Sequence, residues 1–181
     1  MKSNKKGLFE RLVIRNMFHC GQPSCPKVPN HIAVIPDSLN KTSYLTLIEW
    51  GIQHELTELS LFVWPNSYWA KDTVKLKQEW DLLYQELPEL YCQYKFVTSN
   101  HKMPVNPIPN NKGMTVTMYV SYGFDECIES VGSNPDVLIC TGGYHDLNNF
   151  CMDKLSSTEL KFTNVLFEHC DEEVWDDFFS E

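Results

Sequence analysis

Basic side chains are scarce in this sequence. Its 181 residues include 15 Lys and Arg against 24 Asp and Glu, which gives a formal net charge of −9 at pH 7. Proteins that bind nucleic acids broadly neutralise phosphates with Lys and Arg, so this balance argues against a nucleic-acid partner. The sequence also contains no G-x-S-x-G nucleophile elbow and no Ser-His-Asp order typical of serine hydrolases.

Long apolar runs are missing as well. No run approaches the roughly 20 residues that a membrane-spanning helix requires, and the first residues lack the apolar core of a secretory signal. The seven cysteines are an odd number that suits reduced thiols. We therefore expect a cytoplasmic protein. Residues 1–15 hold five Lys and Arg and a single acid, which predicts peripheral contact with a membrane surface or a partner.

The chain does contain enough apolar residues to form a hydrophobic core. Hydrophobic residues make up 43% and aromatic residues 13% of the sequence, which is typical of a folded protein. The length suits one domain. The basic start runs into a stretch with several prolines and a glycine, which is typical of a linker. We predict a basic N-terminal segment and linker over 1–29 and a folded domain over 30–181.

Strand and helix patterns alternate along that domain. The predicted strands are 31–36, 56–65, 94–100, 114–122, 135–143 and 159–167. The predicted helices are 43–55, 73–91, 125–131 and 171–179. Such alternation predicts an α/β fold with a parallel central sheet flanked by helices. Ligands of parallel sheets bind at the carboxyl ends of the strands, so residues that directly follow a strand are the candidates for a site.

Asp37 is the first such candidate. It follows the apolar strand Ile32–Ile35 in the stretch NHIAVIPDSLNK, at the carboxyl end of the strand. A carboxylate there can bind a metal ion or lie close to a phosphate. Taken alone, however, such an aspartate is more often an Asx turn or the N-cap of the following helix, and the single residue favours that local role.

The stretch CTGGYHDLNNF, residues 140–150, is the second candidate. Backbone N–H groups in a Gly-rich turn can cradle a phosphate. The stretch fits no phosphate-loop consensus and contains no Lys or Arg, so a plain turn is the favoured interpretation.

Two groups of His and Cys raise the question of zinc. Their spacing matches no strong zinc pattern, so unpaired cysteines are the favoured interpretation. The members are His19, Cys20, Cys25 and His31 in the first group, and Cys140, His145, Cys151, His169 and Cys170 in the second.

Aromatic residues around the first two predicted helices either line an apolar pocket or, as favoured, fill the core. They are Trp50, Trp64, Tyr68, Trp69, Trp80 and Tyr84.

Four segments carry motifs that together resemble a known family. They are HIAVIPDSLNK (31–41), LTELSLFVWPNSYWAK (56–71), MTVTMYVSYGFDECI (114–128) and PDVLICTGGYHDLNNFCMDKLSSTELKFTNVLF (135–167). In order, they resemble H-x-A-x-I-M-D-G-N-G-R, I-K-E-V-T-V-Y-A-F-S-T-E-N-W-x-R, the strand ending N-Y-G-G-R-x-E-I, and P-D-L-L-I-R-T-S-G-E-x-R-x-S-N-F with the following E-L-x-F-T motif. These are motifs of the cis-prenyltransferase family, which includes undecaprenyl diphosphate synthase. The chain resembles a shortened and divergent member.

The resemblance implies a reaction and a set of residues. Family members condense isopentenyl diphosphate with an allylic diphosphate, with Mg²⁺, in homodimers or heterodimers that hold the growing chain in an apolar tunnel. Asp37 matches the family's catalytic aspartate and Mg²⁺ ligand, and Glu159 matches its second metal-site acid. The substrate-binding residues that the resemblance implies are Lys41, Trp69, Lys71, Gly142, Gly143 and Asn149. Both lysines stand where the family has arginine and lack its bidentate fork.

Several departures leave the activity open. Ser38, Leu39 and Asn40 replace Gly-Asn-Gly, and Cys140 and Asp146 replace two arginines of the isopentenyl diphosphate motif. One hypothesis is an active but unusual prenyltransferase that uses Asp37, Glu159 and Mg²⁺. A second is a catalytically impaired pseudoenzyme or a partner subunit of a prenyltransferase. A third is a binding module for apolar ligands that reuses the tunnel.

Overall fold

The structure is a computed structural model that describes residues 29–65, 73–98, 113–122, 134–143, 147 and 155–180. The predicted N-terminal segment therefore lies outside the described residues except for Pro29. The helix predicted over 125–131 lies outside them as well.

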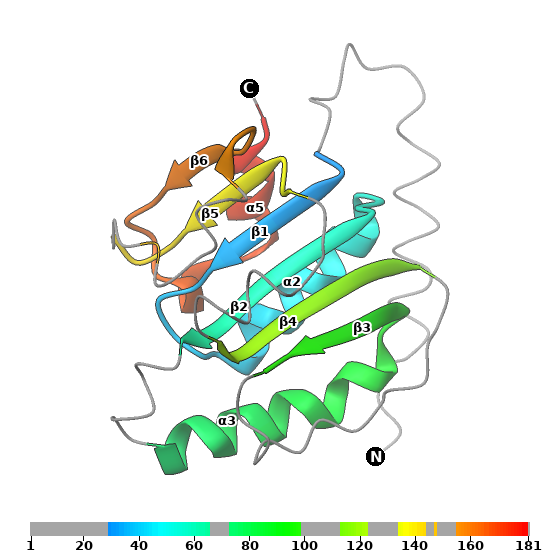
Figure 1. The fold of residues 1–181 in the computed structure, drawn as a ribbon, viewed down its shortest axis with the longest axis vertical. Helices are drawn as coiled ribbons and strands as arrows, with labels where there is room; N and C mark the ends of the chain where they lie inside the picture. The colour runs from blue at the N-terminus through cyan, green and yellow to red at the C-terminus, as the bar shows by residue number, and fades with distance from the viewer. Residues whose placement is uncertain are drawn as a thin grey trace.

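The described residues form a parallel sheet whose strands are ordered β3-β4-β2-β1-β5-β6 (Figure 1). The strands are β1 (His31–Ile35), β2 (Glu58–Pro65), β3 (Cys92–Val97), β4 (Met114–Tyr122), β5 (Val137–Cys140) and β6 (Glu159–Phe162). The predicted α/β class with a parallel central sheet is confirmed. Each predicted strand has its counterpart, and β4 has the predicted bounds.

The central strand β1 is apolar throughout because both of its faces are covered. Ile32 and Val34 belong to one buried cluster, whereas Ala33 and Ile35 belong to a second cluster on the other face. Successive side chains of a strand point to opposite faces, so a strand that is buried on both sides reads as a continuous apolar run. This explains why the sequence HIAVI shows no polar alternation.

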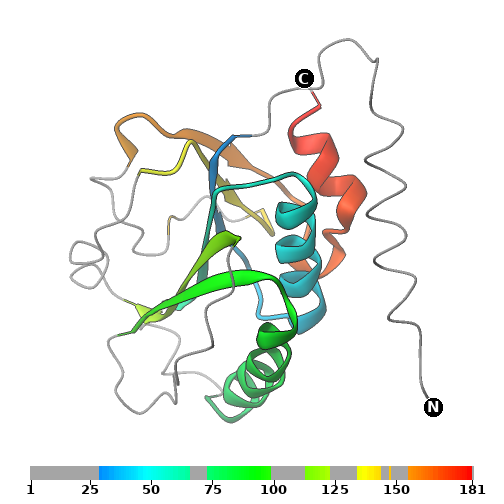
Figure 2. The same ribbon diagram turned by 90° about the vertical axis from the view of Figure 1, so that its right-hand side faces the viewer.

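Three helices pack against the larger cluster. They are α2 (Lys41–Gln53), α3 (Thr73–Glu86) and α5 (Glu172–Phe178), and Figure 2 shows α2 and α5 on the same side of the sheet. Each contributes one fully buried tryptophan, namely Trp50, Trp80 and Trp175. The core interpretation is confirmed for Trp50 and Trp80. Tyr84 packs at the edge of the same cluster. Trp64 belongs to β2, and only its backbone is described; Tyr68 and Trp69 lie outside the described residues.

Several predicted boundaries differ from the observed ones, and the two largest differences are at the ends of one helix and one strand. The helix predicted over 73–91 ends at Glu86 and continues only as the 3₁₀ turn η2 (Leu87–Glu89), because Pro88 has no N–H to donate to the helix. The strand predicted over 159–167 ends at Phe162. Beyond it the chain turns, with the Val165 N–H donating to the Thr163 hydroxyl, into the 3₁₀ turn η4 (Phe167–His169).

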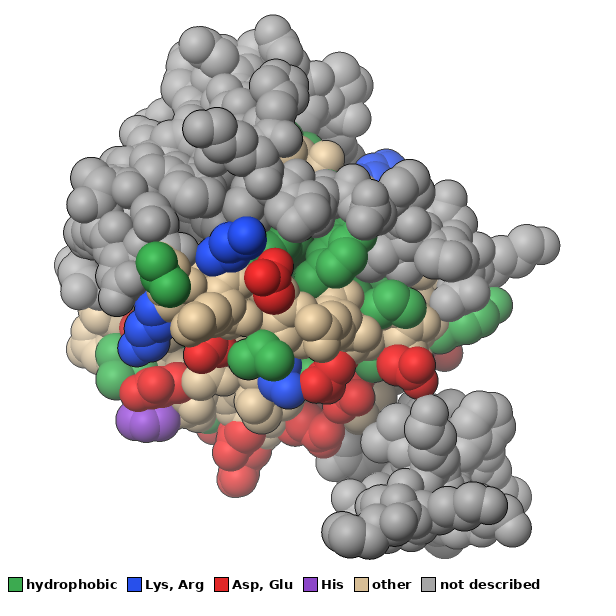
Figure 3. All heavy atoms as spheres, turned by 90° about the horizontal axis from the view of Figure 1, so that it is seen from below, with side chains coloured by type: hydrophobic (Ala, Val, Ile, Leu, Met, Phe, Trp, Pro, Cys, Tyr) green, Lys and Arg blue, Asp and Glu red, His purple; other side chains and the backbone are tan. Residues whose placement is uncertain are grey.

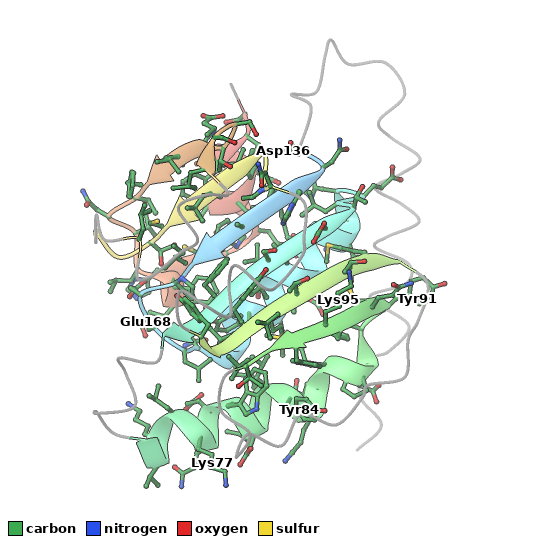
Figure 4. The ribbon with its side chains drawn as sticks, viewed as in Figure 1. Lys77, Tyr84, Tyr91, Lys95, Asp136 and Glu168 are labelled. Atoms are coloured by element: carbon green, nitrogen blue, oxygen red, sulfur yellow. The ribbon has the colours of Figure 1, made fainter. Side chains whose placement is uncertain are left out.

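The parallel strands give the sheet two distinct edges. In Figure 4, Asp136 lies at the start of β5, at the amino edge, whereas Glu168 lies near the carboxyl end of β1. Asp37 and Thr141 directly follow β1 and β5 and therefore lie at the carboxyl edge. No helix in the described part of the chain is long and apolar enough to cross a membrane.

His31 provides a pH-dependent contribution to stability at the amino edge. Its ring is buried, with Nε2 2.9 Å from the Ser60 hydroxyl oxygen and Nδ1 3.8 Å from Oε2 of Glu58. Burial lowers the pKa of His31 below its ordinary value of 6.5, against the opposing effects of Glu58, the Asn134 backbone and Asp136. The unfolded chain therefore binds the proton more tightly than the folded one. The stabilisation is fully present above pH 6.5 and is lost as the pH falls through the folded-state pKa.

We expect the free energy of unfolding to fall between about pH 7.5 and about pH 5.5, and to fall less in His31→Gln. Urea denaturation at both pH values measures this difference. His169→Gln is the matched control, because it makes the same substitution at an exposed position. Equal slopes for wild type and His31→Gln would show that His31 does not titrate as the structure requires.

Candidate functional site

The candidate site is formed by three segments at the carboxyl edge of the sheet. Asp37 follows β1, residues Thr141–Gly143 follow β5, and residues Thr163–Phe167 follow β6. Because β1, β5 and β6 are neighbours in the sheet, these segments meet although they are far apart in the sequence. The predicted gathering of Asp37 and Thr141–Gly143 along one edge is confirmed.

The Asp37 carboxylate is held by two donors. Its Oδ1 accepts hydrogen bonds from the Thr141 hydroxyl at 2.7 Å and from the Phe167 N–H at 2.8 Å. The Asp37 N–H donates to the same Thr141 hydroxyl oxygen at 3.1 Å. The local interpretation of Asp37 as an Asx turn or N-cap is wrong, because both donors come from segments that are distant in the sequence and the N-cap of α2 is Asn40. The carboxylate is therefore oriented by the tertiary structure.

The second carboxylate oxygen is not held by any of the described residues. Oδ2 of Asp37 accepts no hydrogen bond from the described residues. A Mg²⁺ ion is usually held by one or two carboxylates and completes its octahedron with phosphate oxygens and waters. One oriented carboxylate with a free oxygen therefore fits a Mg²⁺ ion that arrives with a diphosphate. It does not fit an all-protein metal cage, and the described residues contain no group of three His, Cys, Asp or Glu that could form one.

Gly142 and Gly143 have a structural role in this arrangement. Both have positive φ, +77° and +71°, which glycine adopts without steric cost. Their N–H groups donate to the carbonyls of Val165 and Thr163, each at 2.8 Å, so these two amides are not free for a phosphate. The plain-turn interpretation fits this geometry. Gly142 also lies against the Asp37 side chain, since a Cβ at Gly142 would be 2.4 Å from that of Asp37.

The N-terminus of α2 lies three residues beyond Asp37. Asn40 caps the helix, with its side-chain oxygen accepting from the Ser43 N–H at 3.1 Å. The N–H groups of Lys41 and Thr42, in the first helical turn, have no intrahelical acceptor. They point out of the N-terminus of the helix, which carries the positive end of the helix dipole. Leu39, which replaces the family's asparagine, packs against the larger core cluster. The start of α2 therefore offers amide donors for an anion.

Lys41, the predicted phosphate-binding cation, has an internal partner. Its Nζ lies 2.6 Å from Oε1 of Glu86, at the end of α3. The ammonium is thus neutralised by a carboxylate in this structure.

The structure does not bring Glu159 and Asp37 together. Glu159 is the first residue of β6 and pairs with Val137, the first residue of β5. It therefore lies at the amino edge, where its nearby cation is Lys161 at 3.7 Å. Within one chain these two acids cannot share one metal ion. Trp69, Lys71 and Asn149, the remaining predicted site residues, lie outside the described residues.

Neighbouring ionisable groups remain neutral beside Asp37. Burial, then the negative charges of Asp37 and Asp171, raise the pKa of the Cys170 thiol to about 12. Burial, then Tyr122 and Asp37, raise the pKa of the Tyr44 hydroxyl. A thiolate nucleophile at Cys170 is therefore excluded at neutral pH. Cys140 and Cys170 are buried and form no disulfide, which agrees with the interpretation that they are core cysteines.

Sequence reasoning missed the groups that orient and neutralise the site. Thr141 is recognisable from the sequence only as a residue at the end of a strand, and the Phe167 N–H and Glu86 carry no sequence signal. All three act through contacts between distant segments, which a motif cannot reveal.

Two solved structures share this fold. A probable undecaprenyl diphosphate synthase from Campylobacter jejuni superposes with a TM-score of 0.69 at 14% identity, over 83% of this chain and 93% of that one. Lavandulyl diphosphate synthase from Lavandula x intermedia, solved in complex with dimethylallyl diphosphate, superposes with a TM-score of 0.73 at 19% identity, over 82% of this chain and 92% of that one. The resemblance expected from the motifs is confirmed at the level of the fold.

The sequence comparisons cover less of the chain. Nerylneryl diphosphate synthase from Solanum lycopersicum, a chloroplastic protein, is 48% identical over 44 residues. This match spans 24% of the present chain and 14% of the length of that protein. No protein-family model matches the chain.

Proposed function

We propose that this chain, which has the fold of the cis-prenyltransferases, is a divergent relative that binds an isoprenyl diphosphate at the carboxyl edge of its sheet. The observation that carries the proposal is the Asp37 carboxylate, which Thr141 and the Phe167 N–H hold through Oδ1, while Oδ2 accepts no hydrogen bond from the described residues. The lavandulyl diphosphate synthase structure, which contains dimethylallyl diphosphate, supports the choice of ligand class.

Each residue has a distinct task in this proposal. Oδ2 of Asp37 would hold a Mg²⁺ ion, which would neutralise charge on the leaving diphosphate. The Thr141 hydroxyl positions Asp37 through two hydrogen bonds: it accepts from the Asp37 N–H and donates to the Asp37 carboxylate. The first-turn amides of α2 bind phosphate oxygens, as helix N-termini commonly do. In the condensation itself, the allylic C–O bond breaks, a C–C bond forms to isopentenyl diphosphate, and diphosphate and a proton leave.

A catalytically impaired partner subunit is the second candidate, and Cys140 favours it. Cys140 stands where the motif has an arginine, and the structure buries its side chain in the smaller core cluster. A charge-assisted hydrogen bond to phosphate contributes about 1.5–3 kcal/mol. Losing one weakens diphosphate binding by roughly tenfold or more. A chain that binds one diphosphate and cannot bind the second would not condense them.

The partners inferred from the resemblance remain proposals of the same kind. We propose a homodimer or a heterodimer with a family member, and peripheral membrane contact through the basic N-terminal segment. The exposed side chains of Leu160, on the edge strand β6, and Leu166 nearby support an interface on that side of the sheet.

Calorimetric titration with dimethylallyl diphosphate, with and without Mg²⁺, tests the ligand. We expect binding that depends on Mg²⁺. Titration with isopentenyl diphosphate and a radiolabelled transfer assay then separate the two candidates. Product formation identifies a transferase, whereas binding of the allylic diphosphate without product identifies the impaired form. Absence of binding at millimolar ligand would refute the proposal for the isolated chain.

Thr141→Val tests the positioning of Asp37. Valine keeps the shape but removes the hydroxyl that both donates to Oδ1 and accepts the Asp37 N–H. We expect a loss of about 1–3 kcal/mol of stability, because the Asp37 N–H loses its acceptor, and a weaker Mg²⁺-dependent affinity for the diphosphate. Urea denaturation and calorimetry measure the two effects.

Thr158→Val is the matched control for that substitution. The Thr158 hydroxyl donates to the Pro135 carbonyl at 2.7 Å, at the opposite edge of the sheet. This variant should lose stability and keep its diphosphate affinity. If both valine variants lowered the affinity equally, the effect would come from lost stability rather than from the orientation of Asp37.

A further inference from the structure

The ion pair between Lys41 and Glu86 joins the start of one helix to the end of another. Lys41 is the first residue of α2 and Glu86 is the last residue of α3. Their charged atoms lie 2.6 Å apart, and the side chains are 30% and 49% exposed. Because both side chains are partly exposed, the pair is accessible to a ligand from solvent. Figure 3 shows the face of the molecule seen from below, where basic side chains lie among acidic ones.

Each member of the pair is unfavourable in its own helix. A helix N-terminus carries partial positive charge, so the cation of Lys41 is repelled there, and a C-terminus carries partial negative charge, which repels Glu86. The pair relieves both repulsions. Without Glu86, the ammonium of Lys41 and the first amides of α2 would together form a positive site for an anion, close in the chain to Asp37.

We propose that the Glu86 carboxylate competes with a bound diphosphate for the Lys41 ammonium. Glu86 pairs with Lys41 until a diphosphate displaces it, and this competition sets the affinity of the site for the diphosphate. This inference rests on the proposed diphosphate function. The Lys41–Glu86 ion pair is weak enough for a diphosphate to replace it. An exposed ion pair shifts an equilibrium by about fivefold or less, whereas a diphosphate with its Mg²⁺ engages Lys41, the α2 amides and Asp37 at once. Glu86 thus weakens binding without blocking it.

The test is a double-mutant cycle on Lys41 and Glu86, with calorimetric titration of inorganic pyrophosphate in Mg²⁺. The variants are Glu86→Gln, Lys41→Met and the double substitution. We expect Glu86→Gln to tighten binding about two- to fivefold and Lys41→Met to weaken it about tenfold. In the Lys41→Met background, Glu86→Gln should have no further effect, because the glutamate then has no cation to occupy.

Glu79→Gln is the matched control, because Glu79 lies seven residues earlier on α3 and its loss removes the same charge. Equal tightening by Glu79→Gln and Glu86→Gln would overturn the proposal, since a general reduction in negative charge would then explain the gain. An unchanged affinity in Glu86→Gln would also overturn it. In that case, Mg²⁺-dependent binding by wild type that is lost in Asp37→Asn would leave the diphosphate function standing.

Two further outcomes separate this inference from the function on which it rests. If wild type and every variant fail to bind pyrophosphate, both proposals are refuted. If Glu86→Gln binds and wild type does not, both are supported, and the occupation of Lys41 is stronger than an ordinary exposed ion pair.

Discussion

Asp37→Asn is expected to abolish Mg²⁺-dependent binding of dimethylallyl diphosphate while the protein stays folded. Asparagine can keep a carbonyl oxygen where Oδ1 accepts from Thr141 and the Phe167 N–H. It then places an NH₂ group, which is neutral and donates, where Oδ2 would face the cation. Losing this oriented carboxylate should weaken the affinity at least about a hundredfold.

Asp37→Ala separates the ligand role of this residue from its structural role. Alanine removes both oxygens, so the Phe167 N–H and the Thr141 hydroxyl lose their shared acceptor. A polar group that is left without a partner in a protein interior costs about 1–3 kcal/mol. We expect Asp37→Ala to lose stability and binding together, and Asp37→Asn to lose only binding.

Calorimetry and urea denaturation of the two variants measure these effects side by side. Wild-type affinity in Asp37→Asn would place the cation elsewhere and would contradict the site. A stability loss in Asp37→Asn as large as in Asp37→Ala would mean that the amide fails to replace Oδ1, and Asp37→Glu would then be the variant to examine.

The fold was predictable because its signals are local or shared with a family. The apolar run at β1 and the β-branched alternation at β4 each identify a strand without help from the rest of the chain. The order of strands and helices then restricts the architecture to a parallel sheet, and the motifs indicate one particular fold. The end of α3 was also recoverable in principle, since Pro88 lies just beyond it.

The site was less predictable because its contacts join segments that the sequence separates. Asp37 meets a hydroxyl 104 residues away and a backbone N–H 130 residues away. Glu159 matches a metal-site acid by motif, but it begins its strand rather than ending it, so a parallel sheet places it at the far edge from Asp37. The sequence predicts Lys41 as a cation available to a phosphate, whereas in the structure its ammonium is paired with the carboxylate of Glu86.

Gly142→Ala is the substitution that we expect to damage the protein most. The alanine Cβ would lie 2.4 Å from Cβ and 2.5 Å from Cγ of Asp37, closer than real contacts allow. The φ of +77° adds strain, which costs about 1–2 kcal/mol for a residue with a side chain. The crowding adds about 1–3 kcal/mol, as overpacking usually does. Against a typical total stability of about 5–15 kcal/mol, this combined loss is large.

Gly143→Ala distinguishes the two components of that loss. Gly143 has nearly the same φ, +71°, so its backbone strain should match that of Gly142→Ala. Its Cβ, however, would be close to the side-chain oxygen of Asn164, at 3.0 Å, and would otherwise make ordinary contacts with Asn164 at 3.9 Å; this side chain is exposed and can move. We therefore expect Gly143→Ala to lose about 1–2 kcal/mol and to keep its diphosphate affinity.

The comparison of these two variants tests the link between the turn and the carboxylate. Thermal and urea denaturation measure stability, and calorimetry with dimethylallyl diphosphate and Mg²⁺ measures the site. If Gly142→Ala folds, its Asp37 must move away from Thr141 and the Phe167 N–H, so binding should be lost even in the folded fraction. Equal stability and affinity in both variants would show that Gly142 does not press against Asp37. The glycine would then be required only for its backbone conformation, and the position of Asp37 would depend on Thr141 and Phe167 alone.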